Sequence, residues 1–191
     1  MSTATSDLEL HATRTGLLLV DWQERLLAAM PAELAQRALR NAVLLVEAAR
    51  RLGLPVILSE QYPKGLGHTV PQLSAALAGL PQLTRFEKLE FGCVGVAPFD
   101  QALAASGRTH WIASGVETHV CLYQTTRALA RTHRVFVPQD AALSRSEANW
   151  RVGLDLMARA GCVITSTETV VFDLLKRAGS DDFRALSKLI K

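Results

Sequence analysis

The sequence lacks the features of a protein that is exported, inserted in a membrane or bound to nucleic acid. Residues 1–7 contain no basic stretch followed by an apolar one, so we expect no secretory signal. Apolar runs such as Gly16–Val20 are far shorter than the roughly 20 residues that span a bilayer. The formal net charge is +3, and no run of Lys and Arg suggests a phosphate-binding surface. We therefore predict a cytoplasmic protein that binds neither membranes nor nucleic acid.

Cysteine is scarce, and its number is odd. Three cysteines do not form a disulfide framework, which fits a reducing cytosol. Each cysteine is therefore explained either by packing in the core or by a chemical role. Cys162 begins an apolar strand and is predicted to lie in the core. Cys93 lies in a Gly-rich loop and can line a pocket, whereas Cys121 follows Gly115 and opens an apparent helix.

The sequence repeats one pattern, in which an amphipathic helix ends at a Gly and a short apolar run follows. The Gly residues are Gly53, Gly107 and Gly161. Gly just past a helix takes the left-handed conformation at low cost. Short apolar runs without alternation are typical of parallel strands that are covered on both faces. The pattern therefore predicts alternating helices and parallel strands.

We expect six strands, near residues 15–20, 55–59, 82–86, 109–114, 134–137 and 162–165, with helices between most of them. This order predicts a three-layer α/β/α fold with a doubly wound, mostly parallel six-stranded sheet and right-handed crossovers. No linker or internal duplication divides the chain. We therefore predict one domain over residues 1–191, of which residues 1–12 form a flexible N-terminal segment.

Ligands of open α/β sheets bind beyond the carboxyl ends of the strands. Three residues with marked chemistry follow or end predicted strands: the acid Asp21, the amine Lys88 and the thiol Cys121. A thiol next to an acid and a lysine can act as an activated nucleophile. These residues therefore indicate an active site at this edge of the sheet.

Three motifs carry a resemblance to a known family: Leu17–Gln23, Phe86–Lys88 and Gly115–Cys121. In this order, they resemble the isochorismatase-like cysteine hydrolases, a superfamily with a Rossmann-like fold that includes nicotinamidases and N-carbamoylsarcosine amidase. Segments 60–67 and 166–169 are similar to the branch called isochorismatase-domain-containing proteins. The resemblance implies that Asp21, Lys88 and Cys121 form a catalytic triad.

The resemblance also implies a cis peptide between Val116 and Glu117, which would aim the N–H groups of Glu117 and Cys121 at an oxyanion. The helix dipole and Lys88 are expected to favour the Cys121 thiolate. Asp21 would take the thiol proton and later give it to the leaving amine. Water would then release the acid product from a thioester.

Six further residues are candidates for the substrate pocket, with ordinary packing as the alternative for the aromatic ones: Trp22, Gln23, Tyr62, Phe91, His119 and Tyr123. A direct pair between His119 and Cys121 is geometrically poor, because residues two apart on a helix point to different faces. We therefore expect His119 to line the pocket or an interface.

No metal or other cofactor is expected. Nicotinamidases carry an Asp-x-His-Pro element whose acid and histidine bind a divalent ion, and here the matching stretch, Glu60–Pro63, has Tyr62 in place of the histidine. His68 is alone, without the spacing of a metal site. The sequence therefore also argues against nicotinamide as the physiological substrate.

Together these features predict a cysteine hydrolase that cleaves a C–N bond of a small amide or ureido compound. Two alternatives remain: a non-catalytic interaction protein that has kept the fold, and a redox-responsive protein in which Cys93 resolves an oxidised Cys121. The resemblance implies a homo-oligomer, either a dimer or a tetramer. The apolar segment 183–190 either supports such an assembly or packs on its own domain.

Overall fold

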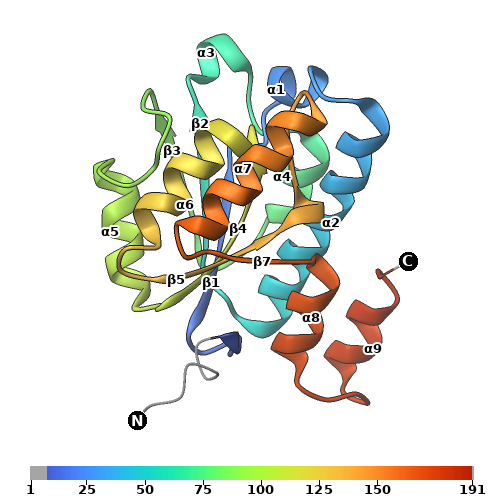
Figure 1. The fold of residues 1–191 in the computed structure, drawn as a ribbon. Coiled ribbons are helices and arrows are strands. Elements are labelled where there is room, and N and C mark those ends of the chain that lie inside the picture. Colours follow the sequence, from blue (N-terminus) through green and yellow to red (C-terminus); the bar gives the residue numbers. More distant parts are fainter. Residues whose placement is uncertain (1–7, 191) are drawn as a thin grey trace.

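The computed structural model describes residues 8–190 and shows a sheet of parallel strands between two layers of helices (Figure 1). The strand order is β3-β2-β1-β4-β5-β7, and β6 pairs with β4. The strands are β1 (Thr15–Val20), β2 (Val56–Gln61), β3 (Leu83–Lys88), β4 (His110–Val116), β5 (Arg134–Pro138), β6 (Ala142–Leu143) and β7 (Val163–Thr165). The predicted fold class is confirmed. The seventh strand, β6, was not predicted because two residues are too few to show a period, and its pairing depends on Gly115 and Val116.

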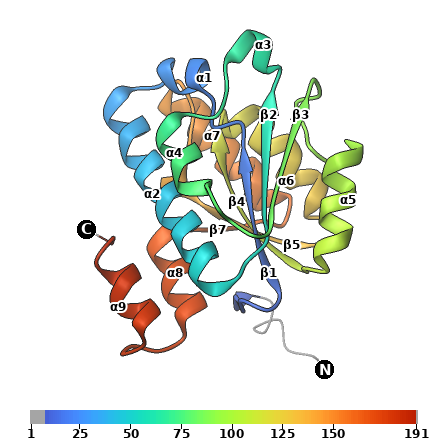
Figure 2. The same cartoon turned by 180° about the vertical axis from the view of Figure 1, so that it is seen from behind.

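The helices cover both faces of the sheet. They are α1 (Glu24–Ala28), α2 (Ala32–Leu52), α3 (Pro63–Leu66), α4 (Pro71–Leu77), α5 (Ala97–Ser106), α6 (Tyr123–Leu129), α7 (Glu147–Arg159), α8 (Thr167–Leu175) and α9 (Asp181–Ser187). Helices α2, α4 and α8 lie on one face, and α5, α6 and α7 lie on the other (Figures 1 and 2). The longest helix, α2, has a polar outer face, and no helix in the described part is long and apolar enough to cross a membrane.

Strand β1 lies at the centre of the sheet, and all six of its residues are buried. Successive side chains of a strand point to opposite faces. Leu17 and Leu19 therefore pack with α2, whereas Leu18 and Val20 pack in the core beneath α5, α6 and α7. This double burial explains why the strand reads as a continuous apolar run.

The two ends of the described chain pack against the same side of the molecule. Residues 1–7 of the predicted flexible segment lie outside the described residues, but Leu10 is 1% exposed and its N–H donates to Asp173. The prediction of a flexible segment is therefore wrong for Leu10, because its side chain has a place in the core. At the other end, Leu186 packs with Leu44 and Val171, so the apolar C-terminal stripe covers its own domain.

Helix α7 approaches the segment after β4 unusually closely, at Gly153. A Cβ atom on Gly153 would lie 2.8 Å from the carbonyl carbon and oxygen of Thr118 and 2.9 Å from the amide nitrogen of His119. Real Cβ atoms almost never come so near to backbone atoms. Because Gly153 has no side chain, α7 can pack directly against the backbone of the turn that begins at Thr118.

We expect Gly153→Ala to lower the free energy of unfolding by about 1–3 kcal/mol, the usual cost of overpacking. Elsewhere in a helix, the same change stabilises by up to about 1 kcal/mol. Urea titration measures the difference. Val152→Ala, at a side chain that is 54% exposed in the same helix, is the control and should change stability by less than about 0.5 kcal/mol. An alanine variant at position 153 that is as stable as the parent would contradict the close contact.

Candidate active site

The carboxyl ends of the central strands bring the three predicted catalytic side chains together. Asp21 follows β1 directly, Lys88 is the last residue of β3, and Cys121 lies in a π-helical turn (Thr118–Leu122) after β4. The ammonium nitrogen Nζ of Lys88 lies 2.7 Å from Oδ2 of Asp21, and both side chains are 0% exposed. The Cys121 thiol lies close enough to the same carboxyl group for each to shift the pKa of the other. One carboxylate thus pairs with the amine and acts on the thiol.

The backbone is strained at this edge of the sheet. Asp21, Tyr62 and Glu117 have φ values of 55°, 39° and 60°, and they follow β1, β2 and β4. Left-handed conformations are costly for residues other than Gly, and they cluster at functional sites. The three turns lead the chain away from the strand ends.

The turn at Glu117 also corrects a prediction. No peptide bond within residues 8–190 is cis, so the expected cis bond between Val116 and Glu117 is absent. The left-handed conformation of Glu117 changes the chain direction between β4 and the π-helical turn with a trans peptide instead. The Glu117 carboxylate is held by Arg145, whose Nε lies 3.0 Å from Oε1. That the N–H groups of Glu117 and Cys121 bind an oxyanion stays a prediction.

Burial dominates the electrostatics of Asp21. Removal from water raises the pKa of its carboxyl group, and the Lys88 ammonium offsets part of this effect. The Ser59 hydroxyl also donates to Asp21, with Oγ 2.7 Å from Oδ1. Ser59 lies in β2, two residues before that strand ends. Its role was not predicted, because a serine in an apolar strand gives no sign of its partner.

The surroundings of the Cys121 thiol disfavour its thiolate form. Burial, and then the negative charge of Asp21, raise the pKa of this thiol far above its usual range, and the opposite effect of Lys88 is smaller. Lys88 acts in the expected direction, but burial and the Asp21 charge outweigh its effect on the pKa of this thiol. The reason is that the Lys88 ammonium sits on the Asp21 carboxylate, which stands next to the thiol.

Two of the six predicted pocket residues do not line a pocket. Trp22 is 0% exposed and packs in the core on the α2 side. Gln23 is also buried, and its side-chain Nε2 donates to the carbonyl oxygens of Gln61 (2.9 Å) and Gly67 (2.7 Å). Both residues follow the first strand, as pocket residues do, but the left-handed turn at Asp21 sends them inward. Sequence position alone gave no sign of this.

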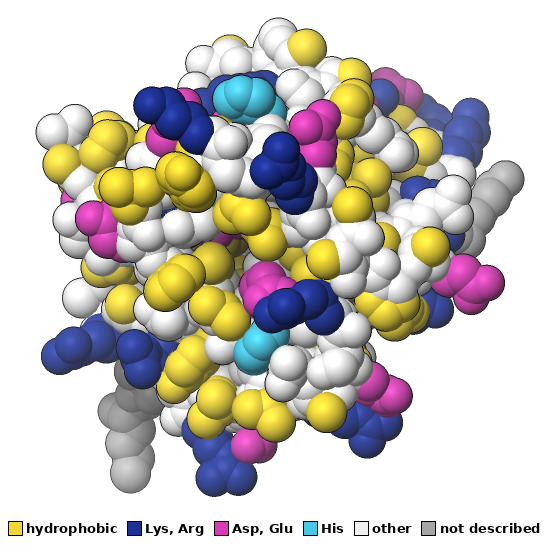
Figure 3. All heavy atoms as spheres, turned by 90° about the horizontal axis from the view of Figure 1, so that it is seen from above, with side chains coloured by type: hydrophobic (Ala, Val, Ile, Leu, Met, Phe, Trp, Pro, Cys, Tyr) yellow, Lys and Arg dark blue, Asp and Glu magenta, His cyan; other side chains and the backbone are white. Residues whose placement is uncertain are grey.

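The other aromatic candidates lie at the surface of this edge or beside it. Tyr62 and Phe91 are 50% and 55% exposed, and Leu89 and Val94 next to Phe91 are also exposed. Seen from above, hydrophobic side chains spread over the left and middle of this face, between groups of charged ones (Figure 3). Tyr123 is partly buried, with the Arg127 guanidinium 4.9 Å from its ring centroid. Tyr62 and Phe91 thus remain candidates for the rim of a site.

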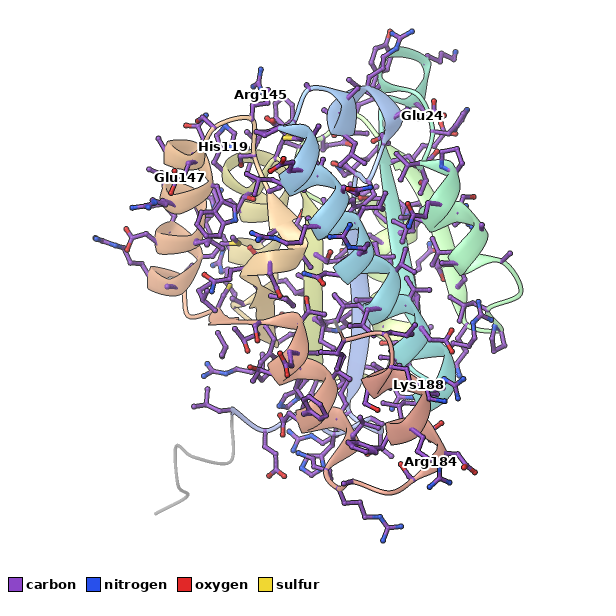
Figure 4. All side chains as sticks on the ribbon, turned by 90° about the vertical axis from the view of Figure 1, so that its right-hand side faces the viewer. Glu24, His119, Arg145, Glu147, Arg184 and Lys188 are labelled. Carbon is purple, nitrogen blue, oxygen red and sulfur yellow. The ribbon has the colours of Figure 1, made fainter. Side chains whose placement is uncertain are left out.

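His119 does not pair with Cys121. Its Nδ1 lies 3.1 Å from Oγ of Ser144, a residue just after β6. Figure 4 shows His119 near Arg145 and near Glu147, the residue at which α7 begins. That His119 lines the pocket or an interface stays a prediction.

The reactive sulfur is nearly closed off. Cys121 is 4% exposed, whereas two cavities of about 460 and 580 Å³ lie beside α2 and are lined by none of the three triad residues. The candidate site lies outside both cavities, which contain neither a thiol nor a buried ion pair. The Cys121 thiol is therefore almost inaccessible to solvent.

The position that corresponds to the nicotinamidase metal element is used for other contacts. Oε1 of Glu60 accepts hydrogen bonds of 2.6 Å from both N and Oγ1 of Thr69, and Oε2 lies 2.9 Å from His68 Nδ1. Within residues 8–190, no three His, Cys, Asp or Glu side chains are grouped to hold a metal ion. The Glu60 carboxylate instead ties the segment after α3 to the end of β2. The absence of a metal or cofactor remains a prediction.

Comparison with known proteins identifies the family. The model of the isochorismatase domain matches residues 15–169. The chain belongs to the isochorismatase family. Isochorismatase domain-containing protein 1 of Salmo salar is 39% identical over 149 residues, which are 77% of this chain and 51% of that protein. The match thus spans about half the length of this relative.

Solved structures of relatives share the fold of this family member. The MAR1 ribonuclease from Caenorhabditis elegans superimposes with a TM-score of 0.87 and 33% identity, over 95% of this chain and 92% of that chain. The YcaC gene product of Escherichia coli, described as an octameric hydrolase of unknown specificity, gives 0.85 and 25%, over 96% and 89%. Their descriptions name different activities, so the site itself must support any choice of reaction.

We expect Asp21→Asn to lower the free energy of unfolding by about 3–5 kcal/mol, because it leaves the buried Lys88 ammonium without its counter-charge. Urea titration measures the loss, and the double variant Asp21→Asn/Lys88→Met should recover part of it. The matched control is Asp155→Asn, which breaks an exposed pair with Arg159 and should cost less than about 1 kcal/mol. Equal effects of the two Asp→Asn changes would contradict the buried pair.

The neutral thiol predicts a pH dependence for alkylation. Iodoacetamide should label Cys121 slowly at about pH 7, and the rate should rise about tenfold per pH unit up to about pH 9, because the thiolate fraction grows tenfold per unit below a raised pKa. Mass spectrometry of the labelled peptide follows the reaction. A rate that is already high and constant below about pH 7 would show a preformed thiolate instead.

Proposed function

We propose that this member of the isochorismatase family is a cysteine hydrolase that cleaves the C–N bond of a small amide or ureido compound. The observation that carries the proposal is the buried carboxyl group of Asp21, which pairs with the Lys88 ammonium and lies close enough to the Cys121 thiol to raise its pKa. A structural protein gains little from a buried ion pair next to a thiol, since such pairs cost as much as they contribute. The description of the E. coli relative as a hydrolase supports the same class of reaction.

The first chemical step forms the thioester. Cys121 Sγ attacks the substrate carbonyl carbon while its proton passes to the Asp21 carboxylate, and the carbonyl oxygen becomes an oxyanion. The N–H groups of Glu117 and Cys121 stabilise this charge, an effect worth about 3–4 kcal/mol for each such donor. Asp21 then returns the proton to the leaving nitrogen, the C–N bond breaks, and ammonia or an amine departs.

The second step releases the acid. A water molecule gives a proton to Asp21 and attacks the thioester carbon, the C–S bond breaks, and the sulfur takes the proton back from Asp21. Throughout the cycle, Lys88 opposes the effect of burial on the pKa of Asp21. The lysine thereby keeps the carboxylate available as a base, although it does not make a thiolate in the free protein.

The closed site bears on substrate size and on assembly. Cys121 is 4% exposed, which favours a small substrate that displaces little of the surface around the sulfur. The exposed apolar side chains of Tyr62 and Phe91 favour a homo-oligomer, a dimer or a tetramer, and a relative is described as octameric. The described cysteines are all free, which supports a cytoplasmic location.

The experiment is a screen of small primary amides, ureas, ureido acids and cyclic imides that measures released ammonia. Cys121→Ser should lower any turnover by at least about a thousandfold, because a serine hydroxyl is a far weaker nucleophile than a cysteine sulfur. Cys162→Ser, at a buried thiol whose Sγ lies 3.8 Å from the Thr126 carbonyl oxygen, is the matched control and should keep most of the activity. A thioester adduct on Cys121 in rapidly quenched samples would identify the acyl group.

Two outcomes would sink the proposal. Turnover that survives Cys121→Ser would remove the thiol from the mechanism. Cleavage of RNA, which is included in the screen because of the C. elegans relative, without turnover of any amide or urea would point to another reaction. The absence of any turnover, together with a stable protein partner in a pull-down, would favour the interaction protein. A Cys93–Cys121 disulfide after mild peroxide would favour the redox alternative. Burial raises the pKa of the Cys93 thiol to about 11, which makes this thiol less reactive.

A further inference from the structure

The Lys88 ammonium uses all of its hydrogen atoms inside the protein. An ammonium group has three N–H donors, and Nζ lies near four acceptors: Asp21 Oδ2 (2.7 Å), Gln61 Oε1 (2.7 Å), and the carbonyl oxygens of Glu90 (3.2 Å) and Phe91 (3.1 Å). The two short contacts go to Asp21 and Gln61. Lys88 is therefore placed as firmly by the neutral amide of Gln61 as by the carboxylate.

The amide of Gln61 can take only one orientation. Its Nε2 donates to the Leu89 carbonyl oxygen at 2.8 Å, so its oxygen must face Lys88. Gln61 is the last residue of β2, pairs in register with Lys88 of β3, and is 7% exposed. One side chain thus contacts the catalytic lysine through its oxygen and the segment after β3 through its nitrogen.

A second glutamine fixes the backbone of the first. The Gln61 N–H donates to Gln23 Oε1 at 2.6 Å, and Gln23 Nε2 donates back to the Gln61 carbonyl oxygen at 2.9 Å. Gln23 follows β1, so the contacts run across the ends of β1, β2 and β3 in turn. Both amides are neutral, and they hold the charged pair without adding a charge of their own.

We propose that Gln61 is a positioning residue of this site, which holds the Lys88 ammonium on Asp21 and anchors the 89–91 segment above the pair. The inference rests on the proposed function for its effect on turnover, but the geometry also predicts an effect on the thiol alone. A second carboxylate at this position would compete with Asp21 for the ammonium. The groups that act on the Cys121 thiol are Asp21, Lys88 and Cys93, and their balance would change.

The test compares Gln61→Glu with Gln61→Met and uses iodoacetamide as the probe of Cys121, so no substrate is required. We expect Gln61→Glu to slow alkylation about tenfold at about pH 8, because an added negative charge that raises the pKa of the thiol by one unit lowers the thiolate fraction tenfold. Gln61→Met removes the acceptor without adding charge and should slow alkylation less. On any amide found in the screen, both variants should lower kcat about tenfold or more while KM changes little.

The controls separate positioning from simple folding. Gln72→Glu makes the same charge change at an exposed position in α4 and should alkylate like the parent. Thermal unfolding of each variant shows whether it is folded. If folded Gln61→Glu protein alkylates at the parent rate, Gln61 does not act through Lys88 and the inference is overturned. The alkylation test does not depend on whether any substrate is found. The inference about Gln61 can therefore fail while the proposed hydrolase function stands, and the hydrolase function can fail while the inference stands.

Discussion

The buried contact between Lys88 and Asp21 is the interaction on which the site depends. Taking either charge out of water costs several kcal/mol, and mutual attraction repays this only with good geometry and additional hydrogen bonds. Here Ser59 and Gln61 supply those bonds, at 2.7 Å to each partner. The pair is thus held by neutral polar groups, and its net charge stays close to zero. The same carboxylate also acts on the pKa of the Cys121 thiol.

The register of the sheet sets the geometry of this pair. Val20, the last residue of β1, pairs with Ser59 and with Gly115, and Gln61 pairs with Lys88, so the four strands end within two residues of one another. A Cβ on Gly115 would lie 2.6 Å from the Val20 carbonyl oxygen, so only Gly allows β4 to approach β1 at this level. A shift of one residue in any strand would turn its side chains to the other face and separate the charged groups.

Burial also has the largest effect on the pKa of the Cys121 thiol. In an open site, Lys88 would favour a thiolate, but in this closed one the neighbouring carboxylate and the loss of water outweigh it. Asp21 and Lys88 thus act on the pKa of this thiol in opposite directions.

The sequence by itself determined the order of strands and helices, because apolar runs and helix-ending glycines depend on neighbours along the chain. It also placed Asp21, Lys88 and Cys121 after strands, where a parallel sheet gathers its ligands. Only the tertiary structure decided that Trp22 points inward, that Glu117 turns without a cis bond and that burial and Asp21 raise the pKa of the Cys121 thiol. It alone revealed Ser59, Gln61 and Gly153 as supports of the site. The reason is that these properties arise between residues far apart in sequence, such as Asp21 and Lys88, and no local pattern records the distances and the exclusion of water that produce them.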